Sequence, residues 1–186
     1  MIGILRRYWP LVAAGMFVTT AILLLLMGRN PICTCGRIEL WHGAIDSGNS
    51  QHLLDWYSFS HIIHGFLFYG AGWLVFRRLP VEVRLLIALV IEAGWELLEN
   101  SPVIIDRYRT ATMALGYTGD SVINSMADIG SMAFGFWVAR KLPWQATVAL
   151  AIGFELMTLW VIRDNLALNI LMLLRPVDAI RAWQAG

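Results

Sequence analysis

The sequence predicts an all-α protein: a polytopic bundle of about five membrane-spanning helices, followed by a C-terminal interfacial or re-entrant segment. Of its 186 residues, 58% are hydrophobic and only 15% are charged, and the mean hydropathy is +0.62. These side chains are too apolar to cover a water-soluble globule of this size. The hydrophobic runs are continuous and do not alternate with period two, which excludes a membrane β-barrel.

The overall charge and length exclude other classes. With 14 Lys and Arg against 13 Asp and Glu, the net charge is +1, so no nucleic-acid partner is expected. Membrane lipids are the expected partners, and the sequence specifies no protein partner. The length fits a single membrane-embedded domain over residues 1–186. The chain also lacks the GxSxG elbow, the Gly-rich phosphate loop and the dinucleotide fingerprint.

The first span is expected at about residues 9–27. Leu11 to Met27 contains no charged residue and follows Arg6 and Arg7, which is typical of the start of a secretory signal. No small-x-small cleavage site follows this run. The segment is therefore interpreted as a retained signal anchor.

Four further spans are expected at about residues 56–76, 85–99, 121–139 and 144–162. Aromatic residues such as Trp56, Trp144 and Trp160 mark their edges, where an interfacial belt would place them. The run over 85–99 is the weakest of these span predictions, because it contains three glutamates. After residue 164 the chain is too short to cross again, and Pro176 interrupts it, so the tail is expected at the interface.

Positive residues near the span ends predict the orientation. They cluster in three short segments that fall on one side if five helices alternate: Arg6 and Arg7; Arg77, Arg78 and Arg84; Arg140 and Lys141. That side, with the N-terminus, is expected to be cytoplasmic in a cell inner membrane. Two long loops, at about residues 28–55 and 100–120, would then be periplasmic.

Polar residues inside the predicted spans are concentrated at one end of the bundle. Because consecutive helices alternate in direction, three polar sets meet on the side of the long loops: His61 and His64; Glu92, Glu96 and Glu99; Asp120, Asn124 and Asp128. Each set has spacings of three or four residues and therefore lines one helix face. Such residues are costly in a membrane and must be compensated. A buried polar chamber near the periplasmic surface is therefore expected.

Imidazoles and carboxylates together are suitable ligands for zinc or a similar divalent ion. The main hypothesis assigns His61, His64, Glu92 and Asp128 to a metal, with Glu96 as a further ligand candidate. Glu96, Glu99 and Asp120 are the candidate catalytic acids and bases. The metal would activate water against a lipid-linked or envelope substrate, as a hydrolase or transferase would.

Two alternatives remain open at this stage. The same residues could form a polar network that only locks the helices together, in a non-enzymatic binding or accessory protein. They could also relay protons or ions. Metal content would separate the first alternative from the main hypothesis.

The loops add candidate substrate-binding residues beside Asn124. His42 stands near the expected mouth of the chamber, and Arg107 and Arg109 could hold a phosphate or carboxylate. Lipid headgroups are the competing partners for these arginines. Cys33 and Cys35 flank a single residue, so free thiols, a labile disulfide and a metal contact all remain open.

Several strings together resemble an uncharacterised family, a domain of unknown function found in small polytopic bacterial inner-membrane proteins. They cover nearly the whole chain and include Ile32-Cys33-Thr34-Cys35-Gly36, Leu40-Trp41-His42-Gly43, Asp55 to Gly65, Trp95 to Pro102, Ile105 to Arg109 and Gly119 to Ser125. The resemblance implies a location in the cell membrane and no activity. A looser likeness to VanZ-like membrane proteins, in the acidic helix and in Asp120, Asn124, Gly130 and Gly135, implies architecture at most.

Overall fold

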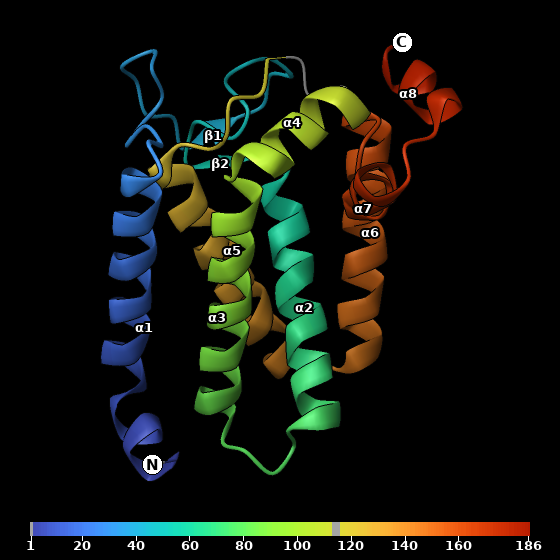
Figure 1. Cartoon of the computed structure of the whole chain (residues 1–186). Coiled ribbons are helices and arrows are strands. Elements are labelled where there is room, and N and C mark those ends of the chain that lie inside the picture. The colour runs from blue at the N-terminus through green and yellow to red at the C-terminus, as the bar shows by residue number, and fades with distance from the viewer. Residues whose placement is uncertain (1, 113–115) are drawn as a thin grey trace.

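The computed structural model describes residues 2–112 and 116–186, and these residues are mostly helical (Figure 1). Five helices are long: α1 (Ile2–Leu26), α2 (Ser58–Val75), α3 (Val81–Glu99), α5 (Val122–Lys141) and α6 (Trp144–Ile162). Three are short: α4 (Pro102–Ala111), α7 (Leu166–Leu174) and α8 (Asp178–Gln184). Two short strands, β1 (Trp41–His42) and β2 (Leu54–Asp55), pair in parallel.

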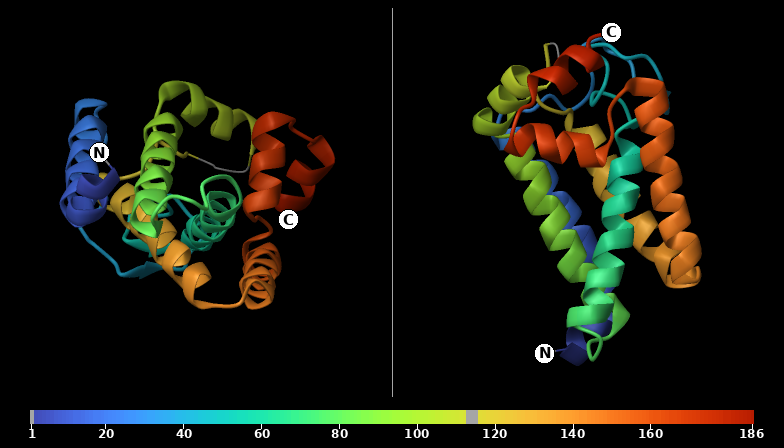
Figure 2. Two further views of the ribbon diagram at one scale, coloured as in Figure 1. Left: turned by 90° about the horizontal axis from the view of Figure 1, so that it is seen from below. Right: turned by 90° about the vertical axis from the view of Figure 1, so that its right-hand side faces the viewer.

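The five long helices run side by side along one axis (Figures 1 and 2). The strands and the three short helices gather at one end, here called the loop end, and the N-terminus lies at the other. Each of the five expected spans falls on one long helix. Helix α1 starts earlier than expected, at Ile2, with a non-helical Tyr8 (φ −109°, ψ 17°) just before Pro10. Proline removes a backbone donor and clashes with the preceding turn, so the helix kinks there.

Three helices, α1, α5 and α6, are long and apolar enough to cross a membrane, with mean hydropathies of 2.1, 1.2 and 1.6. Helix α6 is the clearest case. Among its described residues only Thr158 is buried, and Trp144 and Trp160 are 71% and 85% exposed. A helix with such a continuous exposed apolar surface is stable only in apolar surroundings. The structure is thus that of a helical protein with membrane-spanning character.

Helices α3 and α5 form the centre of the bundle. Leu85 and Leu89 of α3 are buried against Ile129, Met132 and Phe136 of α5. Side chains of α1 complete this core from the other side, among them Trp9, Val12, Met16 and Phe17. The core therefore fixes the relative rotation of α3 and α5, and with it the direction in which their polar residues point.

Helix α2 approaches α5 closely through two glycines. A Cβ atom added at Gly65 would lie 2.1 Å from the Met132 carbonyl oxygen, and one added at Gly135 would lie 2.2 Å from the Ile62 carbonyl oxygen. Only glycine permits this backbone approach, as in other helix pairs packed in membranes. The contact holds the first half of α2, at Ile62 and Gly65, against the second half of α5, at Met132 to Phe136.

The loop over residues 28–55 is tied to the start of α5. The backbone amides of Val122 and Ile123 donate to the carbonyls of Asn30 and Pro31, at 2.8 and 3.2 Å. The first amides of a helix have no partner within the helix, so these carbonyls satisfy them. The tail is tied in a similar way, since the amides of Leu166 and Ala167 at the start of α7 donate to the Glu155 carboxylate.

The glycine contact gives a test of the packing. Gly135→Ala should destabilise the protein by about 2–3 kcal/mol, because the added methyl group collides with the α2 backbone. Gly130→Ala in the same helix meets nothing within 4 Å and should be neutral or slightly stabilising. Thermal unfolding in mild detergent compares the two. Equal midpoints for both variants would contradict the close approach.

Candidate functional site

The site is built where α2, α3 and α5 meet, in their halves nearest the loop end (Figure 1). His61 and His64 come from α2, Glu92 and Glu96 from α3, and Asp128 from α5. The expected convergence of the three polar sets is therefore present for these five residues. Glu92 and Glu96 are 0% and 1% exposed, so the group is buried within the bundle.

Glu92 binds both histidines. Its Oε1 lies 2.6 Å from His61 Nδ1 and 3.1 Å from His64 Nδ1, and its Oε2 lies 3.2 Å from His64 Nδ1. One carboxylate therefore collects the Nδ1 atoms of two imidazoles that stand three residues apart on one helix face. The three donor atoms all lie within 4.8 Å of one another, close enough to hold one metal ion.

Asp128 lies on the opposite side of the His61 ring. Its Oδ2 is 3.8 Å from His61 Nε2, and its Oδ1 accepts a hydrogen bond of 3.4 Å from the Ser58 hydroxyl. Metal-bound histidines commonly donate their second ring nitrogen to a carboxylate. Asp128 was expected to be a ligand, and this placement favours a supporting role through His61.

Glu96 differs from its neighbours in having no hydrogen-bond partner for either carboxylate oxygen among the residues that the structure describes. Its Oε1 lies 3.6 Å from His61 Nδ1, beyond hydrogen-bonding distance. A buried polar group without a partner costs about 1–3 kcal/mol, and a charged one costs more. Of the five site residues, Glu96 is therefore the one whose carboxylate oxygens the described side chains do not satisfy.

Glu99 and Asp120 belong to neighbouring networks. The Tyr108 hydroxyl on α4 donates to Glu99 Oε1 at 2.8 Å, although Glu99 also comes within 4.8 Å of His61 and Glu96 donor atoms. Asp120 exchanges hydrogen bonds with Asn100 at 2.9 and 2.7 Å. Their catalytic roles stay predictions, and in the structure neutral donors hold both carboxylates.

Asp120 lies just before α5. Burial raises the pKa of its carboxyl group above the usual value, and hydrogen bonds from Tyr117 and Asn100 oppose this shift. The Asp120 and Asn100 pair thus joins the end of α3 to the beginning of α5.

The expected substrate-binding residues are dispersed over the loop end. The Asn124 side-chain amide donates to the His52 carbonyl at 2.9 Å, while its Oδ1 is buried without a hydrogen-bond partner among the described residues. Arg107 donates to the Leu173 carbonyl at 2.7 Å, at the end of α7. Arg109 donates to the Tyr117 carbonyl. Both guanidinium groups therefore hold loop-end elements together, and a substrate role for them stays a prediction.

His42 lies in a second polar group, in the loop over residues 28–55. Its Nδ1 is 2.9 Å from Glu39 Oε2, and its Nε2 is 2.9 Å from Asp46 Oδ1. Only the imidazolium form has a proton for both contacts. Burial alone would lower the pKa of His42, but the two carboxylates outweigh burial and hold that pKa above its usual value.

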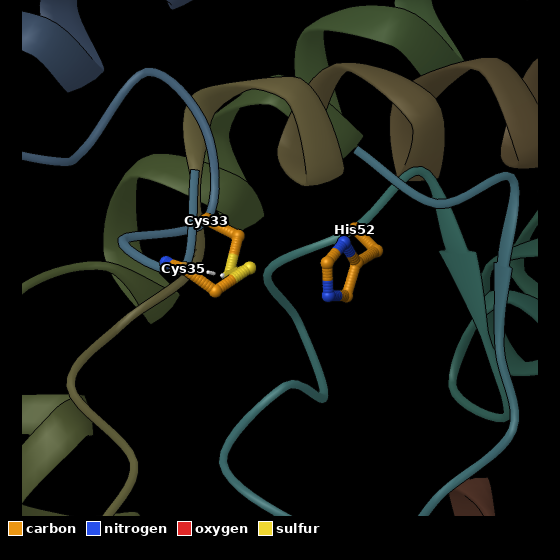
Figure 3. Close-up of side chains that lie close together, drawn as sticks. All are labelled: Cys33, Cys35 and His52. Carbon is orange, nitrogen blue, oxygen red and sulfur yellow. Dashed lines mark hydrogen bonds between the residues drawn. A yellow bond between two sulfur atoms is a disulfide. The ribbon is translucent and has the colours of Figure 1, made fainter. Parts of the chain in front are cut away.

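Cys33 and Cys35 form a disulfide, which decides among the three alternatives left open for them. His52 lies beside the pair on a neighbouring loop (Figure 3). The Glu39 backbone amide donates to His52 Nδ1 at 3.2 Å, so a neutral His52 carries its proton on Nε2. A metal bond through Nε2 would require the proton to move to Nδ1, which would break the hydrogen bond from the Glu39 amide. His52 is therefore oriented as a hydrogen-bonding residue, which leaves the α2, α3 and α5 site as the better metal candidate.

Comparison with known proteins gives the family. Residues 24–186 match a family model described as "Protein of unknown function (DUF2585)". The chain belongs to this family. It is 59% identical over 182 residues to a UPF0314 protein of Rhizobium etli (strain CIAT 652), covering 97% of this chain and 93% of the relative.

Two further relatives match over nearly their whole length. A UPF0314 protein of Novosphingobium aromaticivorans is 59% identical over 186 residues, covering 97% of this chain and 94% of the relative. One of Sphingopyxis alaskensis is 58% identical over 186 residues, covering 99% and 98%. No solved structure matches the chain significantly. The looser likeness to VanZ-like proteins is not shown by these relatives.

Several residues that contact the candidate site were not among the residues predicted from the sequence. Ser58 escaped notice because a serine at a helix start is ordinarily a cap, whereas here its hydroxyl donates to Asp128. Tyr108 and Asn100 were read as loop residues, although they hold Glu99 and Asp120. The sequence did contain a signal for Asn100 and Tyr108, because both are polar residues that closely follow the acidic helix.

The carboxylates around His42 predict a titration. Because the folded-state pKa of His42 is raised, its charged form stabilises the loop at low pH, and this contribution is lost as the pH rises through the raised pKa. Nuclear magnetic resonance of protein with labelled histidine should show His42 titrating above about 6.5. Glu39→Gln should lower that pKa, and Glu82→Gln, on α3, should leave it unchanged. Titration below the usual value in the wild type would contradict the two contacts.

Proposed function

We propose that the chain is a multi-pass inner-membrane protein of five spans whose buried site binds a divalent metal ion such as zinc. The ion would serve hydrolysis or group transfer on a lipid-linked or envelope substrate. The observation that carries the proposal is Glu96, a buried carboxylate that has no hydrogen-bond partner among the described residues and lies 3.6 Å from His61 Nδ1 in a group of histidines and acids.

The five-span topology is supported by the lengths of α2 and α3. They contain 18 and 19 residues, or about 27–29 Å of helix, close to the thickness of a bilayer core of about 30 Å. The histidines and glutamates of the candidate site make these two helices more polar than a simple span. Two short loops, 76–80 and 142–143, lie at the end opposite the loop end. Arg77 and Arg78 lie in the first loop and Lys141 directly precedes the second, which supports a cytoplasmic assignment for the end with these short loops.

The ligand set is argued from the Nδ1 atoms of His61 and His64 and from Glu92. In a tetrahedral zinc site with bonds of about 2.0–2.1 Å, neighbouring donor atoms stand about 3.3 Å apart. The His64 to Glu92 distances of 3.1 and 3.2 Å fit this value, and the 2.6 Å contact of His61 would open slightly. Two histidines and one glutamate leave a fourth position free, which is the pattern of catalytic zinc sites.

Charge favours a divalent cation over a proton alone. Glu92 and Glu96 would bring two negative charges into the bundle, and one divalent ion with neutral histidines balances them. An ion pair of His61 with Glu92 balances only one of these charges, so without the cation Glu96 would be protonated to avoid the cost of an unpaired buried charge. A protonated Glu96 could not accept a proton from water, so the proposed base requires the cation.

Glu96 would then act as the general base. With the ion held by His61, His64 and Glu92, a bound water would lie near Glu96, whose oxygens are not used by other side chains among the described residues. A metal ion lowers the pKa of its bound water to about 7, and a nearby carboxylate can accept the proton. Asp128, bonded by Ser58, would hold the His61 ring in its ligand orientation.

The proposal predicts how metal binding responds to shape-conserving substitutions. Glu92→Gln and His64→Ala should lower metal affinity by about 10–100-fold or more, because each removes a ligand. Glu96→Gln should keep the metal but abolish complementation of a strain that lacks the gene, because it removes the base. Glu82→Gln, in the first turn of the same helix, is the matched control and should change neither property.

Elemental analysis of protein extracted in mild detergent without chelators measures the metal. One equivalent in the wild type and in Glu96→Gln, but little in Glu92→Gln, is the expected pattern. The absence of metal from the wild type, together with full complementation by all three site variants, would contradict the proposal and favour a structural polar network.

The topology makes a separate prediction. In a variant without the native cysteines, an impermeant thiol reagent applied to intact cells should label Ser47→Cys in the loop over residues 28–55. Arg78→Cys, at the opposite end, should be labelled only after the membrane is opened. The reverse pattern would show that the site faces the cytoplasmic side.

A further inference from the structure

A groove of about 360 Å³ lies between α2 and α5. Its walls include Ser58, Phe59 and Ile62 from α2 and Ala127, Gly130 and Phe134 from α5. These residues all precede Gly65 and Gly135 in their helices, so the groove lies on the loop-end side of the close helix contact. Its volume is within the range of about 300–1,000 Å³ found for small-molecule sites.

The groove opens on the outer surface of the bundle. Phe134 at its edge is 61% exposed. Gly130 leaves space in the wall, since a Cβ atom added there would meet nothing within 4 Å. In a membrane-spanning bundle this surface faces lipid. Hydrocarbon fills such an apolar space more favourably than water does.

The groove and the polar site meet at Ser58. Ser58 lines it and also donates its hydroxyl to Asp128, which in turn lies 3.8 Å from His61 Nε2. A surface that only contacts surrounding lipid does not need this polar connection to the interior. The combination of an apolar channel and a polar inner edge suits a molecule with a hydrocarbon chain and a polar head.

We propose that the groove binds one hydrocarbon chain of a lipid, and that this chain orients a lipid substrate with its polar linkage beside Ser58 and Asp128. This inference rests on the proposed function and narrows its substrate class to lipids with an acyl or prenyl chain. The apolar walls offer few hydrogen-bond partners to a peptide backbone, which argues against a protein segment as the occupant.

Photo-crosslinking tests the inference. The full chain is reconstituted in vesicles of phosphatidylethanolamine and phosphatidylglycerol that contain a phosphatidylglycerol with a diazirine in one acyl chain. After illumination, the crosslinked residues are mapped by mass spectrometry. Crosslinks should concentrate on residues 58–62 and 127–134, relative to the exposed face of α6 around Ile152 and Leu156.

Filling the groove provides the second measurement. Gly130→Leu should lower crosslinking at residues 58–62 by about tenfold, equivalent to about 1.4 kcal/mol of binding free energy. Gly153→Leu on α6 is the matched control, because a Cβ atom there also meets nothing within 4 Å, and it should leave this crosslinking unchanged. Helix content and elution volume of both variants check that they are folded.

Equal crosslinking of the groove and the α6 face in the wild type would mean ordinary surrounding lipid and would overturn the inference, even if Gly130→Leu does not fold. So would unchanged crosslinking in a folded Gly130→Leu variant. Metal content measured on the same samples separates the two proposals. If the groove binds lipid but the protein contains no metal, the metal proposal is wrong and the lipid-binding proposal stands.

Discussion

The cost of placing ionisable groups in an apolar interior is the constraint on which the rest of this structure depends. A carboxylate buried without a partner costs several kcal/mol, so each acid in the bundle must have a partner within reach. His61 supplies that partner on both sides of its ring, to Glu92 through Nδ1 and toward Asp128 through Nε2. The two acids belong to α3 and α5, so one imidazole joins three helices. The glycine contact between α2 and α5 serves the same requirement. It brings the α2 backbone close to α5, so that His61 can lie between Glu92 and Asp128.

The acids of the bundle differ in whether their carboxylate oxygens have hydrogen-bond partners. This difference distinguishes acids that connect elements of the fold from an acid that is free to react. Glu99 is held by a tyrosine hydroxyl and Asp120 by an asparagine amide, and both pairs connect elements at the loop end. Such neutral donors stabilise a carboxylate without preparing it to react. Glu96 is buried beside the same histidine with both oxygens unpaired among the described residues. Natural sequences remove such groups unless something else compensates them, and a cation or a reacting water is the compensation that this donor set suits.

Much of this arrangement is predictable from the sequence because membrane helices obey simple rules. Continuous apolar runs located the five long helices to within a few residues, apart from the early start of α1, and alternating direction brought His61, Glu92, Glu96 and Asp128 to one end. The side-chain conformations could not be predicted in this way, because helical spacing does not specify which ring nitrogen of His61 faces Asp128. The short helix α4 was not expected, so Tyr108 had no predicted position and the partner of Glu99 stayed hidden. The pairing of His42 with Glu39 and Asp46 depends on loop conformation, which has no periodic pattern to indicate it.

The access routes to the site follow from how the loop end is closed. The Ser121 hydroxyl donates to the Gln51 carbonyl and the Asn124 amide donates to the His52 carbonyl, so the loop over residues 28–55 is bonded across the beginning of α5. These buried hydrogen bonds would have to break before a large polar molecule could approach from that side. The groove between α2 and α5 leads to Ser58 without breaking any of them. A lipid chain that already resides in the bilayer would occupy this groove with those hydrogen bonds intact. The polar linkage of a lipid lies near the membrane surface, at the depth where a site in the outer turns of these helices would meet it.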